Sequence, residues 1–115
     1  INRNDNWYES KTNIIKVKTI TGKQLLNKIN RDVDVCKIDV EGLTIEVLIS
    51  FGEDLNKIKS FHLECEHNEV WKDQKLYDDV AKFLINNDYT QIYFHYCSGG
   101  TLQSDSIWVL NKYLK

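Results

Sequence analysis

The chain has 115 residues, of which 42% are hydrophobic and 28% charged, a composition typical of one domain with a single core. Its 15 basic and 17 acidic residues leave a formal net charge of −2, so no excess of positive charge is available to bind the phosphates of a nucleic acid. No apolar run approaches the roughly 20 residues that span a bilayer, and the three cysteines are far apart and form no CxxC pair. The sequence therefore predicts a cytoplasmic protein without nucleic-acid or membrane partners, disulfide scaffold or zinc knuckle.

The first third of the chain predicts an irregular stretch, a strand and a helix. Residues 1–13 are rich in asparagine and show no hydrophobic period. Residues 14–21 alternate β-branched side chains, which is typical of a strand. Residues 23–30 place their large apolar side chains at helical spacing, so we expect a short amphipathic helix there.

The middle of the chain alternates between strand and helix patterns. Residues 33–40 predict a mostly buried strand whose polar residues gather at its carboxyl end. A helix is expected over residues 43–51, a strand over 59–66 and a second, clearly amphipathic helix within 74–87.

Two further strands end the predicted fold. Residues 89–97 and 106–110 are strand-like and are separated by a glycine turn at residues 98–100, so they must pair antiparallel. Strands that alternate with helices favour an α/β fold whose sheet is mostly parallel, here with a terminal antiparallel hairpin.

Charged residues gather where the predicted strand 33–40 ends. Ligands of open α/β sheets bind beyond the carboxyl ends of the strands, and Asp39 and Glu41 fall at that edge. Carboxylates there can take a proton from a substrate hydroxyl, hold a cationic ligand or ligate a hard metal. Alternatively, Asp39 caps the following helix and Glu41 lies at its favourable N-terminus. Burying the Lys37 ammonium group without a partner costs free energy, so we expect it to pair with a carboxylate.

The next predicted strand is also polar at its end. Its alternation places His62, Glu64 and Glu66 on one face and Cys65 and His67 on the other. A buried parallel strand would be almost uniformly apolar, so this polarity indicates either a functional site or a solvated face. The spacing does not match a zinc site, and we assign no metal ligands.

Four segments resemble the FkbM-type methyltransferases: VDVCKIDVEGLTIEVL, FHLECEH, LYDDVAKFLINNDY and SDSIWVL. The core of the resemblance is KIDVEG, followed by a helix with a Val-Leu pair and preceded by a V-x-T-I-like strand at residues 17–20. The resemblance covers roughly residues 17–110. Two positions differ from the family pattern. Thr21 occupies a position where the family often has Asp, and Thr44 occupies a position where the family often has an acidic residue.

The resemblance implies an S-adenosylmethionine-dependent O-methyltransfer reaction on a Rossmann-like sheet, with the hydroxyl of a small molecule or sugar as methyl acceptor. Asp39 is the first choice for the catalytic base or positioning group and for cofactor contact, and Glu41 is the second. Lys37, Glu64 and His67 are expected at the acceptor site.

The family's glycine-rich cofactor loop would precede Ile1, so the resemblance also implies that this chain is the C-terminal half of a methyltransferase domain. We therefore expect residues 1–115 to form one partial domain that is inactive alone and binds S-adenosylmethionine weakly or not at all. The strand 33–40 would lack a neighbour, and an unpaired strand edge favours homo-oligomers.

Two other function classes stay open. The chain could be a non-catalytic module that binds a partner or itself through its free sheet edge. A less favoured alternative is a metal-dependent hydrolase built on the carboxylate cluster.

Overall fold

The computed structural model describes residues 12–97 and 99–115 of the chain. Each predicted element from residue 23 onward is found, with bounds within three residues of the prediction, and two short 3-10 helices, η1 and η2, are added. The elements are α1 (Gly22–Ile29), β1 (Val33–Ile38), α2 (Thr44–Ser50), η1 (Gly52–Lys57), β2 (Ile58–Glu66), α3 (Tyr77–Asn86), β3 (Tyr89–Tyr96), β4 (Gln103–Leu110) and η2 (Asn111–Tyr113).

The described strands form one four-stranded sheet in the order β1-β2-β4-β3. β1 pairs with β2 in parallel, whereas β4 pairs antiparallel with both β2 and β3. The prediction of an α/β fold with an antiparallel β3–β4 hairpin is confirmed. The prediction of a mostly parallel sheet is wrong for the described strands, because β4 lies between β2 and β3 and separates two strands that run in the same direction.

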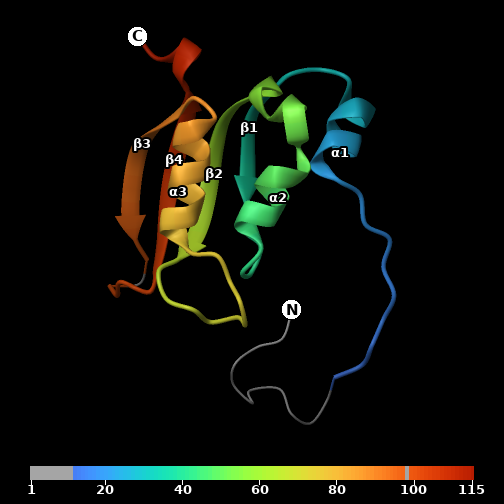
Figure 1. Ribbon diagram of the computed structural model, residues 1–115, viewed down its shortest axis with the longest axis vertical. Coiled ribbons are helices and arrows are strands. Elements are labelled where there is room, and N and C mark those ends of the chain that lie inside the picture. The colour runs from blue at the N-terminus through green and yellow to red at the C-terminus, as the bar shows by residue number, and fades with distance from the viewer. Residues whose placement is uncertain (1–11, 98) are drawn as a thin grey trace.

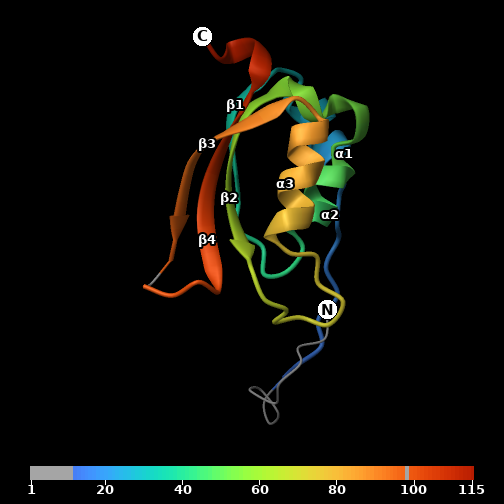
Figure 2. The ribbon, with the colours of Figure 1, turned by 60° about the vertical axis from the view of Figure 1, so that its left-hand side comes forward.

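The helices α1, α2 and α3 cover one face of the sheet, so the molecule has two layers (Figures 1 and 2). The core lies between these layers, and Leu48, Phe61 and Trp108 are among its largest buried side chains. The opposite face of the sheet is not covered by any described element in either view. The polar positions of β2 and β4 that alternate with the core positions lie on this open face.

Residues 14–21 do not form the predicted strand. The described part of this segment has no regular secondary structure, and Ile14 and Val17 are 99% and 72% exposed. A strand needs a neighbour for its backbone hydrogen bonds, and no described strand lies beside this segment (Figure 1). Of the irregular extension predicted for residues 1–13, residues 1–11 lie outside the described part, as does Ser98 of the predicted turn.

The strand β1 is exposed rather than mostly buried. It occupies an edge of the described sheet, and Val35 in its centre is 64% exposed. The prediction of a mostly buried strand was wrong because a Val/Ile-rich pattern is the same for a central strand and for an edge strand. Its buried residue Ile38 lies under the helices at the carboxyl end.

Candidate functional site

The carboxyl ends of β1 and β2 lie side by side and bring two acidic residues together. The register pairs Ile38 with Leu63, so Asp39 and Glu64 follow at the same edge of the sheet (Figure 1). The negative charge of Asp39 therefore acts on the neighbouring Glu64 carboxyl group. This juxtaposition was expected from the sequence, since parallel strands end at a common edge.

Burial raises the pKa of the Glu64 carboxyl, and the negative charges of Asp39 and Asp105 raise it further. Glu64 is therefore harder to ionise than an exposed glutamate, because several acidic groups surround it at this edge of the sheet.

Two predicted site residues lie close to this pair. The ammonium group of Lys37 is 4.0 Å from Asp39 Oδ2, and its side chain is 57% exposed. Lys37 thus meets a carboxylate as predicted, but in solvent rather than in the interior. The charge of Glu41 raises the pKa of both Glu64 and Glu66, which places it near the same carboxylates.

A close contact fixes the turn that carries Glu41. Gly42 has a φ of 81°, a left-handed conformation that favours glycine, and a Cβ built there would lie 2.5 Å from Cδ1 of Trp71. The loop from residue 67 to residue 76 therefore packs onto this turn. Gln74 anchors the loop, since its amide nitrogen donates to Glu66 Oε2 at 2.7 Å and its oxygen accepts from the backbone of Trp71 at 3.1 Å.

Thr44 connects the start of α2 to the end of β2. Its side chain is buried, and its hydroxyl donates to the backbone oxygen of Glu64 at 3.2 Å. This bond holds the Glu64 backbone against the turn that follows Asp39. The family's frequent acidic residue at this position is thus replaced by a hydroxyl with a structural role.

His67 lies in a different group of side chains. Its ring stacks on Tyr77 with centroids 4.8 Å apart and contacts the rings of Phe94 and Tyr96. Its Nε2 is 2.8 Å from the hydroxyl of the buried Ser104. Burial lowers the pKa of His67, although the charge of Asp78 opposes this. His67 therefore belongs to an aromatic cluster, apart from the predicted carboxylate site.

Sequence reasoning missed Asp105 as a neighbour of Glu64. The two residues face each other across β2 and β4, and Asp105 Oδ1 also lies 3.4 Å from His62 Nε2. The thiol of Cys97 donates to the other oxygen of Asp105 at 3.5 Å. The only sequence signal was the alternation in QSDSIWVL, which extends β4 back over Asp105.

An open groove of about 500 Å³ adjoins Asp39 on the free side of β1. Most of its lining is apolar and comes from α1, β1, α2 and the residues that follow β1 and α2: Leu25, Cys36, Ile38, Val40, Val47 and Phe51. Asp39 and Lys37 are the charged residues that line it.

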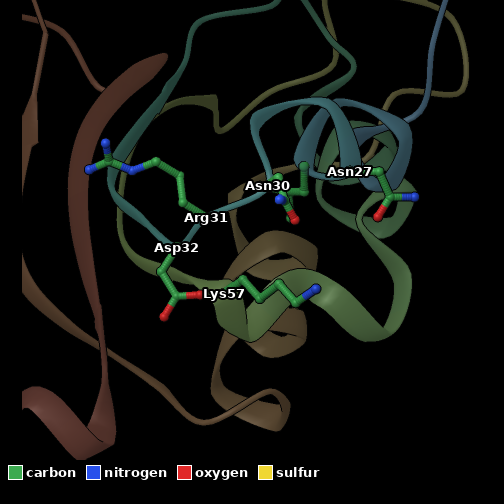
Figure 3. Close-up of a pocket in the computed structure, with 6 residues that line it drawn as sticks. Asn27, Asn30, Arg31, Asp32 and Lys57 are labelled. Carbon is green, nitrogen blue, oxygen red and sulfur yellow. The ribbon is translucent and has the colours of Figure 1, made fainter.

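A second pocket, of about 450 Å³, lies near the amino end of β1 and is shown in Figure 3. Its cationic side chains, Arg31 and Lys57, point in different directions, and Lys57 Nζ is 3.3 Å from Asp54 Oδ1. Because these two cationic groups do not converge on a common point, the lining of this pocket does not form a binding site for an anion.

Within residues 12–97 and 99–115, no three His, Cys, Asp or Glu side chains are arranged to hold a metal ion. In the same part of the chain, no helix has the length and apolar character needed to cross a membrane.

Comparison with known proteins identifies the domain. Neither a curated protein nor a solved structure gave a match to this chain. The family model described as the methyltransferase FkbM domain matches residues 2–91, which is well over half of the chain and includes Asp39, Glu41 and Glu64. The chain therefore belongs to the FkbM methyltransferase family.

Proposed function

We propose that the paired carboxyl groups of Asp39 and Glu64 form the acceptor side of an S-adenosylmethionine-dependent O-methyltransferase site. The observation that carries this proposal is that Asp39 and Glu64 follow paired positions at the carboxyl edge of β1 and β2, in a chain of the FkbM family. The acceptor would be a hydroxyl group of a small molecule or a sugar.

Asp39 is the proposed general base. Its carboxylate is about half exposed and can take the proton that the acceptor hydroxyl loses when its oxygen is methylated. Glu64, whose pKa is raised first by burial, lies beside Asp39 at the same edge and would contribute to the acceptor site. The Lys37 ammonium can donate to an acceptor oxygen from the same edge.

The residues present fit the chemistry of the cofactor. Methyl transfer needs a methyl group on a sulfonium centre, which S-adenosylmethionine supplies when bound. Its positive charges suit the carboxylates of Asp39 and Glu41, and the apolar groove beside Asp39 suits uncharged parts of a ligand. Asp39 and Glu41 are thus the residues of this chain that would hold it.

The test is methyl transfer by the full-length gene product, measured as S-adenosylhomocysteine formed with a panel of sugars and small alcohols. We expect Asp39→Asn to lower kcat by about 10²–10⁴-fold, the usual contribution of a general base, and to leave the melting temperature nearly unchanged. Asp34→Asn is the matched control, since Asp34 lies at the other end of the same strand and pairs with exposed Lys59. Unchanged turnover with a lower melting temperature in Asp39→Asn would instead indicate a helix cap.

A further inference from the structure

The loop of residues 67–76, named the β2–α3 loop from here on, is tied to the end of β2 by one side chain. Gln74 Nε2 donates to Glu66 Oε2 at 2.7 Å. Gln74 Oε1 accepts from the backbone nitrogens of Val70 and Trp71 at 3.0 and 3.1 Å. Glu66 is the last residue of β2 and only 5% exposed, so close packing leaves this anchor little freedom to move.

The β2–α3 loop also contacts the turn of residues 39–43, which carries both carboxylates proposed to hold the cofactor. The loop and the turn lie at the same edge of the sheet (Figure 1). Trp71 lies so close to Gly42 that a Cβ there would be 2.5 Å from Cδ1 of the Trp71 ring. Within the turn, the backbone nitrogen of Leu43 donates to the oxygen of Val40 at 3.3 Å. A movement of the loop would therefore reach the turn through Trp71.

The turn is thus connected to β2 at two points. One connection is direct, since the Thr44 hydroxyl donates to the backbone oxygen of Glu64 at 3.2 Å. The other is indirect and runs from Glu66 through Gln74 to Trp71. Both connections end within the last three residues of β2, so together they fix the turn relative to that end of the strand.

We propose that Gln74 is a positioning residue: through Trp71 it holds the turn so that Asp39 meets the methyl acceptor in a reactive geometry. Gln74 does not touch the substrate itself. Its effect on the rate rests on the proposed function, in which Asp39 takes the proton of the acceptor. Misplacing a reacting group by about 1 Å can cost about 10²-fold in rate, so a contact at this distance from the reaction can matter.

Exchanging the two hydrogen-bonded side chains provides a sharp test. Gln74→Glu removes the donor and sets a second carboxyl group against Glu66, which breaks the connection. Glu66→Gln combined with Gln74→Glu restores it, because the amide at position 66 donates and the carboxylate at position 74 accepts from it and from the loop backbone. Glu66→Gln alone should have little effect, since glutamine can turn its oxygen toward the Gln74 amide.

Asn87→Ala is the matched control. It also removes a side-chain amide that donates to the backbone, here to the oxygen of Phe83 at 2.8 Å. Asn87 lies at the other end of α3 from the β2–α3 loop, so this variant loses a comparable hydrogen bond without affecting the turn.

The first experiment is hydrogen exchange by mass spectrometry on the full-length gene product, which requires no activity. We expect Gln74→Glu to speed exchange at least about tenfold in peptides covering residues 67–76 and 40–44, since a hydrogen bond to a charged group is lost. Peptides from β3 and β4 should be unchanged, and the combined variant should restore both rates. Gln74→Ala replaces Gln74→Glu if the latter does not fold. Unchanged exchange in either the loop or the turn would overturn the proposal, whatever the enzyme catalyses.

The second experiment measures kcat at a temperature at which every variant is folded. We expect Gln74→Glu to lower kcat by about tenfold or more, the combined variant to return it near the wild-type value, and Asn87→Ala to leave it unchanged. Wild-type kcat in Gln74→Glu, no recovery in the combined variant, or an equal loss in Asn87→Ala would each overturn the positioning role. Asp39→Asn tests the proposed function separately: unchanged turnover there refutes that function, while the exchange data still report whether Gln74 holds the turn.

Discussion

At the scale of single residues, the candidate site is defined by a glutamate whose ionisation is disfavoured. Glu64 is partly buried, and Asp39 and Asp105 add negative charge on either side of it. Ionising Glu64 would place a third negative charge in this row, so the folded protein holds the proton more tightly than the unfolded chain does. This arrangement lowers the stability of the folded protein as the pH rises above the usual pKa of a glutamate.

Glu64→Gln should therefore stabilise the protein at neutral pH. Because the folded pKa of Glu64 is raised above 4.5, the wild type has this group's full contribution below that pH and loses it as pH rises through the folded pKa. The glutamine keeps the neutral state, so the variant should gain up to about 1 kcal/mol at neutral pH, a value limited by solvent screening. Urea unfolding from pH 4.5 to neutral pH measures this gain. Parallel pH profiles of the two proteins would contradict the assignment.

Gly42→Ala should destabilise the turn more than the same change at Gly52. Both glycines have positive φ values, 81° and 57°, so alanine meets backbone strain of about 1–3 kcal/mol at each. Only Gly42 also lies against Trp71, whereas a Cβ at Gly52 meets nothing within 4 Å. Thermal unfolding of the two variants therefore isolates the Trp71 contact. Equal losses would show that the loop moves aside without a penalty.

At the scale of elements, helix α1 begins at a capping box rather than after a strand. Thr21 Oγ1 accepts from the backbone nitrogen of Gln24 at 3.1 Å, and the Gln24 side chain accepts from the Thr21 backbone at 2.8 Å. Aspartate is also a good N-cap, so the Asp that the resemblance led us to expect at this position would cap the helix equally well. The cap thus fixes the start of α1 at Gly22.

Thr21→Ala should lower the free energy of unfolding by about 0.5–2 kcal/mol, the usual cost of a lost cap. Thr21→Asp should restore it, since an aspartate accepts the same hydrogen bond and suits the positive end of the helix dipole. Chemical denaturation with circular dichroism measures both. If Asp behaves like Ala, the cap does not stabilise α1 in solution.

At the scale of the whole molecule, a buried tyrosine joins segments far apart in the sequence. Tyr89 at the start of β3 donates its hydroxyl toward the backbone oxygens of Leu55 at 2.9 Å and Ile58 at 2.5 Å. Burial raises the pKa of Tyr89 to about 12. Its ring also packs on Phe61 with centroids 5.3 Å apart, so one side chain links η1, β2 and β3.

Tyr89→Phe should destabilise the whole fold by about 1–3 kcal/mol, because it leaves buried carbonyl oxygens without their donor. Tyr93→Phe is the control, since Tyr93 lies on the same strand and is 49% exposed. For a domain of about 100 residues, 1 kcal/mol corresponds to about 4–8 °C in melting temperature. Equal melting temperatures for the two variants would contradict a structural role of the Tyr89 hydroxyl.

The elements and part of the site were predictable because they depend on local pattern. The spacing of apolar residues located α1, α2 and α3, and the KIDVEG turn placed Asp39 and Glu41 at a strand end. His67 was placed at the acceptor site because it follows a strand. The structure shows His67 in an aromatic cluster with Tyr77, a contact between the residue after β2 and the start of α3 that no local pattern contains.

The sequence by itself determined the α/β class, the terminal hairpin and the carboxylates at the ends of neighbouring strands, since periodicity and turn residues act over a few positions. Only the tertiary structure decided that β4 lies between β2 and β3, which sets Asp105 opposite Glu64. Burial raises the pKa of Glu64, and the charges of Asp39 and Asp105 add to this effect. The tertiary structure also decided that β1 is an exposed edge. Strand order depends on hydrogen bonds between distant segments, and an isolated strand pattern contains no information about its neighbour.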